Sequence, residues 1–330
     1  MNIHKNSWLM DSDAELLLRK LTWRSLWELM HLAEQDDQLQ VLNEYRWALS
    51  LWAEHTNDTK QKVIVTLDGR DTAWKGSNIK RVTEYFDIKR YSEIAFWIPS
   101  AEQKFEHNWF RRYMDHFPKE WEVAFFDRSW YNRAWVEAAM WFCTQEEYDW
   151  FMANVNEFEK SQIIDESIKF IKVYLSVTKE TQKERLRKRE SARKRWKSSP
   201  IDKVAQEKWN YYTLAKAKIL ELTDSEHAPW TVLDSNEKWL SSIEIIKSII
   251  NTTDEVAKIV QKDLSIDLSP NREISRTATE ELKRMNEKWY LDTMKNQFNF
   301  KELTVEEQEE LDSMKENMVF DEESYSYIKN

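Results

Sequence analysis

The chain has 330 residues, of which 41% are hydrophobic and 13% aromatic, so it is long enough and apolar enough to fold around a core rather than stay disordered. Its 59 acidic and 49 basic residues give a formal net charge of −10, and no segment approaches the roughly 18 consecutive apolar residues of a membrane-spanning helix. The N-terminal segment carries acids where a signal peptide needs an apolar run, and the lone Cys143 has no disulfide partner within the chain, so we expect a cytoplasmic protein without membrane contact.

The predicted elements alternate between strands and helices after a helical N-terminal segment. Apolar residues recur near helical spacing over residues 12–55. Five continuous apolar runs of strand length follow, at Val63–Leu67, Ile94–Ile98, Val123–Phe126, Phe170–Val177 and Trp230–Leu233. Continuous runs are typical of parallel strands that are buried on both faces. The pattern therefore predicts a three-layer α/β fold with a mostly parallel five-stranded sheet.

Charge is distributed unevenly along the chain. Residues 253–330 contain 19 acids and 11 bases, a net charge of −8, whereas residues 179–203 contain 11 bases and 4 acids. Such a basic run is either a solvated helix face or a segment that binds a polyanion. We predict an N-terminal helical segment at 1–60, a core at 61–252 that includes the basic run, and an acidic helical C-terminal extension at 253–330.

The first predicted strand leads into a sequence similar to a phosphate-binding loop. The general pattern is G-x-x-x-x-G-K-[ST] between a strand and a helix. Here Gly69 opens the pattern, Trp74 stands in place of the second glycine, Lys75 follows, and Gly76 replaces the hydroxyl residue, with Ser77 next. In such loops backbone N–H groups and a helix N-terminus bind phosphate oxygens, and the lysine adds a mobile charge.

The third predicted strand ends in Asp127, which is followed by two arginines. A carboxylate at this position is typical of a Walker-B arrangement that binds Mg²⁺, although an aspartate here can also cap the next helix. Arg128 and Arg133 form either surface ion pairs or a bidentate clamp on phosphate. The phosphate loop upstream favours the metal interpretation of Asp127.

Five blocks of sequence together resemble the family-2 polyphosphate kinases: GRDTAWKGSNIKR, FDRSWYNRAWVE, FCTQEEY, KRWKSSPID and HAPWTVLDSNEK. In that family the first block normally reads GRDxAGKG and the second DRSWYNRAGVE. The resemblance covers residues 42–250 and keeps the order and spacing of the family. It implies a P-loop-kinase-like core with a helical lid, and a phosphotransferase that moves a phosphoryl group between inorganic polyphosphate and a nucleoside mono- or diphosphate with Mg²⁺.

The resemblance also implies roles for individual residues. The catalytic residues would be Asp71, Lys75, Asp127 and Arg128, with Asp71 and Asp127 as the metal ligands. The residues that bind phosphate or substrate would be Gly69, Arg70, Thr72, Ala73, Trp74, Gly76, Ser77, Lys80, Arg81, Arg133, Arg189, Arg193, Lys194, Arg195 and Lys197. The last five of these belong to the lid over the polyphosphate. We expect polyphosphate and a nucleotide as partners, a homo-oligomer, and no nucleic acid.

Two other functions stay open at this point. An ordinary P-loop kinase that uses ATP would also carry an arginine-rich lid, but the DRSWYNR and KRWKSSP blocks favour polyphosphate. A binding protein on an inactive kinase scaffold is the second alternative, because Trp74 would fill space that a phosphate needs. Intact Asp71, Lys75 and Asp127 argue against this alternative.

The residue counts contain one anomaly, which is 2 glycines beside 18 tryptophans. Average usage of about 7% would give roughly 23 glycines. Four tryptophans stand where the resemblance calls for glycine: Trp74, Trp121, Trp135 and Trp141. We hypothesise that the gene uses UGA for glycine and that the printed sequence translates UGA as tryptophan.

Overall fold

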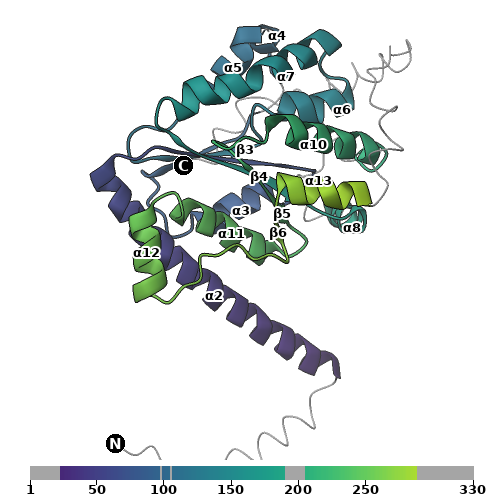
Figure 1. Cartoon of the computed structure of the whole chain (residues 1–330). Helices are drawn as coiled ribbons and strands as arrows, with labels where there is room; N and C mark the ends of the chain where they lie inside the picture. The colour runs from purple at the N-terminus through teal and green to yellow at the C-terminus, as the bar shows by residue number, and fades with distance from the viewer. Residues whose placement is uncertain (1–22, 97–98, 105, 190–204, 288–330) are drawn as a thin grey trace, which may run out of the picture.

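The computed structural model describes residues 23–96, 99–104, 106–189 and 205–287. A long helix, α2 (Trp23–Thr59), precedes a six-stranded sheet that carries helices on both faces (Figure 1). The strands are β1 (Val63–Gly69), β2 (Tyr91–Ile94), β3 (Val123–Asp127), β4 (Lys169–Ser176), β5 (Trp230–Asp234) and β6 (Ser275–Thr277). Their spatial order is β2-β3-β1-β4-β5-β6. The predicted three-layer α/β fold is confirmed.

The number of strands differs from the prediction by one. β1 to β5 are parallel to one another, as predicted, and β6 adds an antiparallel edge strand beside β5 through the pairs Thr231↔Thr277 and Leu233↔Ser275. β6 has the sequence Ser-Arg-Thr and no apolar run, because an edge strand needs backbone hydrogen bonds rather than a buried face. The second strand also lies earlier than predicted, at Tyr91–Ile94.

Helices cover the two faces of the sheet in separate groups (Figure 1). One face carries α2, α3 (Lys75–Val82), α11 (Lys238–Ile250) and α12 (Asp254–Asp263). The other carries α5 (Glu106–Met114), the π-helix η1 (Arg133–Glu137), α6 (Ala138–Met140), α7 (Gln145–Glu159), η2 (Lys160–Ile164) and α10 (Trp209–Thr223), with the short α4 (Ala101–Lys104) beside α5. Two further helices come soon after strands: α8 (Lys179–Arg189) follows β4, and α13 (Ala278–Glu287) follows β6.

The core is divided by the sheet because β1 is apolar on both sides. Val63, Val65 and Leu67 are fully buried on the side of α2, α3 and α11, and Ile64 is fully buried on the opposite side. Successive side chains of a strand point to opposite faces, so this single strand anchors both halves of the core. The first turn of α3 is thereby held against the carboxyl end of the sheet.

The residues after α11 pack onto the domain rather than extending away from it. The backbone N–H of Asp234 donates to the carbonyl of Ile274 at 2.7 Å, and the ammonium group of Lys247 donates to the carbonyl of Ser269 at 2.9 Å. α13 packs against α10. Residues 254–287 therefore share the core of the sheet, whereas residues 288–330 lie outside the described part of the chain.

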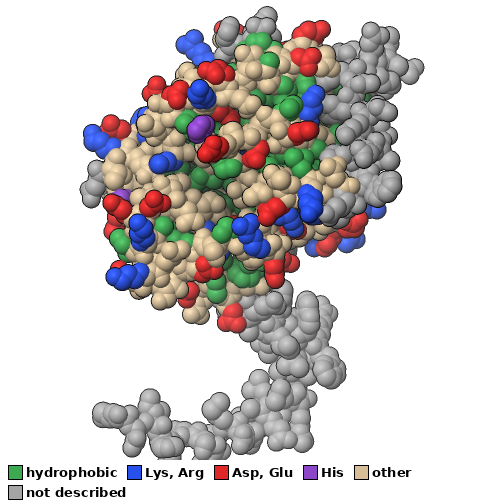
Figure 2. Space-filling view, in the orientation of Figure 1, with side chains coloured by type: hydrophobic (Ala, Val, Ile, Leu, Met, Phe, Trp, Pro, Cys, Tyr) green, Lys and Arg blue, Asp and Glu red, His purple; other side chains and the backbone are tan. Residues whose placement is uncertain are grey.

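No helix among the described residues is long and apolar enough to cross a membrane. On the face shown in Figure 2, acidic and basic side chains are interspersed rather than gathered into patches of one sign. The charges that matter for a phosphorylated ligand are therefore better sought at the edge of the sheet.

Candidate active site

Four strand ends meet at one edge of the sheet. β1 ends at Gly69, β3 at Asp127, β4 at Ser176 and β5 at Asp234, and these strands run parallel. Ligands of open α/β sheets bind in the crevice outside such carboxyl ends. Two of the predicted catalytic residues, Asp71 and Lys75, follow β1. The other two are Asp127, which ends β3, and Arg128, which follows it, so all four lie at this edge.

The loop between β1 and α3 is closely packed. Gly69 has a φ of +141°, and a Cβ at this position would lie 2.4 Å from the carbonyl oxygen of Leu175, so only glycine fits. Thr72 and Trp74 have φ values of 66° and 71°, and α3 begins directly afterwards at Lys75. The loop thus brings the N-terminus of α3 to the sheet edge, as a phosphate-binding loop requires.

Lys75 is buried within this loop. Its ammonium group donates to the carbonyl oxygens of Gly69 and Arg70, both at 3.1 Å. Burial lowers the pKa of Lys75 to about 8, helped by the nearby Arg128, while the carboxylates of three aspartates oppose this shift: Asp127, Asp71 and Asp68. Lys75 is therefore a buried ammonium group that lies near three carboxylates.

Asp71 and Arg128 form an ion pair across the loop. Burial favours the neutral form of Asp71, but the cations Arg128, Lys75 and Arg189 outweigh burial and hold its pKa below the usual range. The pKa of Arg128 is raised, because its carboxylate neighbours outweigh the cost of burying the guanidinium group. Both side chains are thus charged, and the electrostatic effect of Arg189 places the end of α8 near this pair.

Asp68 lies beneath the loop and was not predicted as a site residue. It accepts hydrogen bonds from the Ser129 hydroxyl at 2.6 Å and the Ser129 backbone N–H at 3.3 Å. Burial raises the pKa of Asp68 to about 6. The contact joins the end of β1 to the residues that follow β3, so Asp68 supports the position of Arg128. A carboxylate near the end of an otherwise apolar strand is the signal that would have found it.

Asp127 lies against the first turn of α3, beside a second carboxylate. A Cβ at Gly76 would lie 2.8 Å from Oδ2 of Asp127 and 3.6 Å from Oε1 of Glu93, so both carboxylates face the same point. This explains why glycine stands where the loop pattern has a hydroxyl residue. Burial raises the pKa of Glu93, and the nearby Asp127 adds to the effect. Glu93 on β2 was not predicted, because its motif-free strand carries no signal for a site.

The two carboxylates fit a magnesium ion that shares its ligands with substrate phosphates. Among the described residues, no group of three or more His, Cys, Asp or Glu side chains is placed to hold a metal alone. Mg²⁺ is usually bound by one or two carboxylates together with phosphate oxygens and water. Asp127 and Glu93 satisfy that requirement, whereas Asp71 is engaged by Arg128.

Two residues of α8 brace the phosphate loop from outside, and neither was predicted. Arg185 donates to the carbonyls of Thr72, Ser235 and Asn236, each at 2.9 Å. Gln182 donates to the carbonyl of Asp71 at 3.1 Å. Arg185 lies inside the basic run, but charge alone does not distinguish a loop-bracing arginine from a solvated one. The base of the predicted lid is therefore tied to the loop that it would cover.

Other loop residues have contacts that hold the loop in place. Ala73 is fully buried, and its carbonyl accepts a hydrogen bond from the hydroxyl of Ser235 at 2.8 Å. Arg70 contacts α10: its guanidinium group donates to the carbonyl of Trp209 at 3.1 Å and to the hydroxyl of Thr213 at 2.5 Å, and it stacks 3.6 Å from the Trp209 ring centroid.

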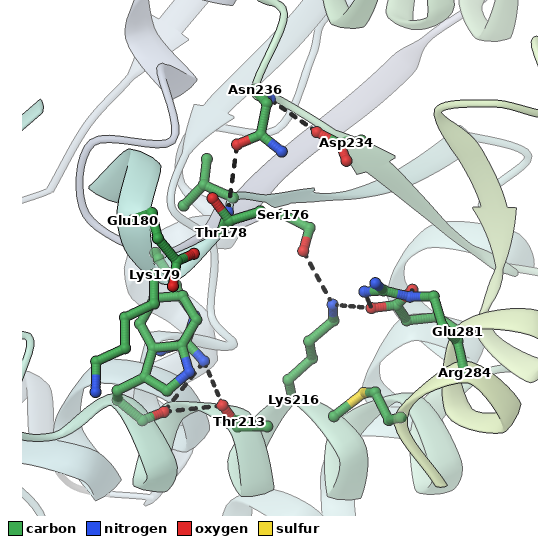
Figure 3. Close-up of a pocket in the computed structure, with 14 residues that line it drawn as sticks. Ser176, Thr178, Lys179, Glu180, Thr213, Lys216, Asp234, Asn236, Glu281 and Arg284 are labelled. Carbon is green, nitrogen blue, oxygen red and sulfur yellow. Dashed lines mark hydrogen bonds and ion pairs between the residues drawn. The ribbon is translucent and has the colours of Figure 1, made fainter. Parts of the chain in front are cut away.

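Arg70 also lines a pocket of about 250 Å³ between the ends of β4 and β5 and the helices α8, α10 and α13 (Figure 3). One side is formed by Lys179 and Glu180 of α8, by Asp234 at the end of β5 and by Asn236 after it. The amide oxygen of Asn236 accepts the backbone N–H of Thr178 at 3.3 Å. The pocket therefore adjoins the phosphate loop through Arg70 and contains side chains of both charges.

The opposite side of this pocket is built on Glu281 from α13. Its carboxylate, which is fully buried, accepts hydrogen bonds from Lys216 at 2.6 Å and from Arg284 at 2.7 Å and 2.9 Å. Figure 3 shows Lys216 reaching from α10 to Ser176 and Glu281. Burial disfavours the charge, but these cations outweigh it and lower the pKa of Glu281 to about 2.

The structure gives Arg133 partners within the protein. Its guanidinium group is buried, lies 4.0 Å from the ring centroid of Trp109, and forms ion pairs with Glu147 at 2.9 Å and Glu137 at 3.4 Å. It also donates to the carbonyl of Lys104 at 2.9 Å. A phosphate clamp at Arg133 would require it to exchange one of these carboxylates for phosphate, and that role stays a prediction.

The remaining predicted residues differ in how near they lie to the loop. Ser77 lies in the first turn of α3, while Lys80 and Arg81 lie in its last turn. Burial and the nearby Arg46 lower the pKa of Arg81, while Glu84 opposes the shift. The carbonyl of Arg81 accepts a hydrogen bond from Arg46 at 2.7 Å. The predicted lid residues Arg193, Lys194, Arg195 and Lys197 lie outside the described residues.

A phosphate loop after the first strand, a carboxylate that ends the adjacent strand, and an arginine-bearing helix hydrogen-bonded to the loop define a P-loop-kinase-like protein. Comparison with known families narrows this class. The family model described as "Polyphosphate kinase 2 (PPK2)" matches residues 32–261. The chain belongs to the polyphosphate kinase 2 family.

Individual relatives agree with this assignment. The chain is 37% identical over 211 residues to NDP-polyphosphate phosphotransferase 2 of Ruegeria pomeroyi, a match that covers 64% of this chain and 60% of the relative. It is 33% identical over 255 residues to polyphosphate kinase PPK2B of Corynebacterium glutamicum, covering 75% and 82%. Among solved structures, polyphosphate kinase 2 from Arthrobacter aurescens TC1 matches with a TM-score of 0.57 and 27% identity, covering 72% and 80%. The chain thus spans about 60% of the length of the Ruegeria relative.

Proposed function

We propose that this protein transfers a phosphoryl group between inorganic polyphosphate and a nucleoside mono- or diphosphate. The observation that carries the proposal is the convergence of Asp71, Lys75, Asp127 and Arg128 on one phosphate loop in a polyphosphate kinase 2 family member. Phosphoryl transfer depends mainly on positioning and charge neutralisation. A loop, two cations and two or three carboxylates can supply both.

Each charged residue has a distinct proposed role. Lys75 gives up its carbonyl partners and binds the transferring phosphoryl group, and Arg128 neutralises the bridging oxygen. Asp127, with Glu93 beside it, would hold Mg²⁺, which would supply positive charge to the phosphate oxygens. Asp71 orients the acceptor oxygen, and its predicted role as a second metal ligand would require release of Arg128.

The polyphosphate chain is proposed to run along the basic residues 179–203. The described part of this segment, α8, is anchored to the phosphate loop by Arg185 and Gln182, and Arg189 acts electrostatically on Asp71. A polyanion gains most from clustered cations, because it releases counterions on binding. We expect no nucleic acid to compete at this site, and we expect the protein to act as a homo-oligomer in the cytoplasm.

We propose that the functional unit runs through residue 287 rather than ending near residue 252. β6 completes the sheet, and Glu281 forms the side of the pocket that adjoins Arg70. A chain that ends at residue 252 would lack the carboxylate partner of Lys216 and would uncover the face of α10 against which α13 packs. Composition and charge change at residue 253, where the sequence predicted a boundary. The packing of β6 and α13 supports a functional unit that continues to residue 287.

The inactive scaffold is the second candidate function, and one observation favours it for the chain as printed. The indole of Trp74 lies at the N-terminus of α3, with the Lys238 ammonium group 3.7 Å from its ring centroid. A phosphate in the loop would have to displace this ring. The ATP-dependent kinase has no such observation in its favour.

One assay tests the proposed function. The Trp74→Gly variant is incubated with Mg²⁺, each nucleoside mono- and diphosphate in turn, and either polyphosphate or ATP as the donor, and products are separated by chromatography. We expect phosphorylation of at least one acceptor, and loss of it when Mg²⁺ is chelated. Transfer from ATP but never from polyphosphate would contradict the proposal, and no transfer from either donor would support the inactive scaffold.

A further inference from the structure

Three tryptophans occupy a backbone conformation that suits glycine. In the described ranges eight non-glycine residues have positive φ, and three of them are tryptophan: Trp74 at 71°, Trp121 at 59° and Trp141 at 57°. The left-handed region costs an ordinary L-residue about 1–2 kcal/mol, because its Cβ approaches the following carbonyl oxygen. Asparagine and aspartate tolerate this region better than a large aromatic residue does. Tryptophan at three such sites is therefore unexpected.

The hydrogen bonding of the indole N–H groups also divides the buried tryptophans into two groups. Four buried indoles donate hydrogen bonds at 2.9–3.1 Å, those of Trp52, Trp109, Trp130 and Trp230. In contrast, the buried indole nitrogens of Trp74 and Trp135 have no hydrogen-bond partner among the described residues. A buried tryptophan normally finds an acceptor for its N–H, because burying it without one costs free energy. The two tests are independent, since one concerns the backbone and the other the side chain.

We infer that the protein made in its own cell carries glycine at positions 74, 121, 135 and 141, and tryptophan at 52, 109, 130 and 230. Positions 74, 121 and 141 rest on backbone conformation, and positions 74 and 135 rest on the unsatisfied indole. Each suspect position fails at least one test, whereas the other four pass both: they donate hydrogen bonds and none has a positive φ. This pattern results if the cell decodes UGA codons as glycine while the printed sequence translates the same codons as tryptophan.

At position 74 the inference bears on the site, and this step rests on the proposed function. The Trp74 ring lies between Lys238 and Arg185, whose cationic groups are 3.7 Å and 5.3 Å from its centroid. Glycine would remove the ring from the N-terminus of α3, at a point that the cationic groups of Lys238 and Arg185 approach. Position 74 is thus expected to be glycine, because the absence of a side chain lets a phosphate approach the backbone of the loop.

The direct test is the coding sequence together with peptides isolated from the source cells. We expect UGA codons at 74, 121, 135 and 141 and UGG codons at 52, 109, 130 and 230, and tandem mass spectrometry should find glycine in the first four peptides. UGG codons, or tryptophan-containing peptides, at positions 74, 121 and 141 would overturn the inference. This readout is independent of activity, so it also separates a failed inference from a failed proposed function.

A stability test uses matched variants of the printed chain. Trp121 is 43% exposed, so its removal loses little burial. Relief of the left-handed strain should make the folding equilibrium constant of Trp121→Gly about fivefold larger than that of Trp121→Ala, because alanine keeps the Cβ. Trp52→Gly, at a buried and hydrogen-bonded indole, should strongly lower the midpoint of thermal unfolding. Equal stability of Trp121→Gly and Trp121→Ala would count against a glycine at this position.

Discussion

Two clusters of buried and partly buried charge lie along the same sheet edge and differ in how completely they are neutralised. The wall cluster is Lys216, Glu281 and Arg284, and every charge in it touches an opposite charge at 2.6–2.9 Å. The loop cluster is Asp68, Asp71, Lys75, Asp127 and Arg128. In the loop cluster Lys75 binds two carbonyl groups, and Asp127 lies beside a second carboxylate.

The difference distinguishes charges that hold the fold from charges that await a ligand. A closed ion pair contributes to one packed arrangement, and breaking it leaves a buried charge without compensation. An incompletely neutralised group, such as Lys75 with its two carbonyl partners or Asp127 beside Glu93, can gain a partner when substrate and metal arrive. Loss of the wall cluster should therefore reduce stability, whereas loss of the loop cluster should reduce turnover.

The largest expected effect is on stability, from Glu281→Ala. The change leaves Lys216 and Arg284 without their shared carboxylate, and removal of one partner of a buried pair costs about 3–5 kcal/mol. Urea unfolding followed by circular dichroism measures the loss. Glu226→Ala, at an exposed position in the loop before β5, is the matched control and should change stability by less than about 0.5 kcal/mol.

The acid limb of the stability curve sharpens the same prediction. The folded pKa of Glu281 is lowered from 4.5 to about 2. Its stabilising contribution is thus complete above pH 4.5 and is lost as the pH falls toward 2. The Glu281→Gln variant should unfold with a weaker pH dependence across this interval, and an unchanged slope would mean that the ion pair does not stabilise the fold.

The second prediction concerns turnover. In the Trp74→Gly background, Lys75→Ala and Asp127→Asn should each lower kcat by about 100-fold or more, because each removes charge control from the transition state. Steady-state kinetics at saturating polyphosphate measures the loss. The midpoint of thermal unfolding should change little, since neither residue is in a closed ion pair. A large loss of stability in these variants would place the loop cluster among the structural charges.

A third, smaller effect separates the two glycines of the loop. Gly69→Ala should cost about 1–3 kcal/mol or more of stability, because its φ is unfavourable and the new Cβ would meet a backbone carbonyl 2.4 Å away. At Gly76 the Cβ would meet the Asp127 side chain, which can move. Gly76→Ala should therefore retain more stability than Gly69→Ala but raise the Mg²⁺ concentration needed for half-maximal activity. The reverse order of stability would contradict this account.

The smallest expected effect is a pH dependence that arises from Lys75. Burial lowers its pKa to about 8, and only the protonated form attracts phosphate. The kcat/KM of the free enzyme should therefore be constant below pH 8 and fall above it. Lys75→Arg is the control, because arginine stays protonated, and its lower activity should show no such decline. A decline of equal midpoint in both proteins would assign it to another group.

The sequence by itself determined the parallel core, the phosphate loop and the family. Strands β1, β3, β4 and β5 were predicted within a few residues, because continuous apolar runs report burial on both faces. The loop residues were found because a phosphate loop is a local motif, in which neighbours along the chain act together. The hypothesis of glycine at the four tryptophan positions likewise came from composition and motif.

Only the tertiary structure decided which charges neutralise one another. Lys216 and Glu281 are 65 residues apart in sequence, and Arg185 reaches a carbonyl of the loop 113 residues away. Nothing in the sequence near Glu281, Arg185 or Glu93 distinguishes them from solvated charges, because a charge acquires its role from partners that folding brings together. β6 was not predicted, because its three residues pair with β5 through backbone groups, which are the same in every residue and leave no pattern in the sequence.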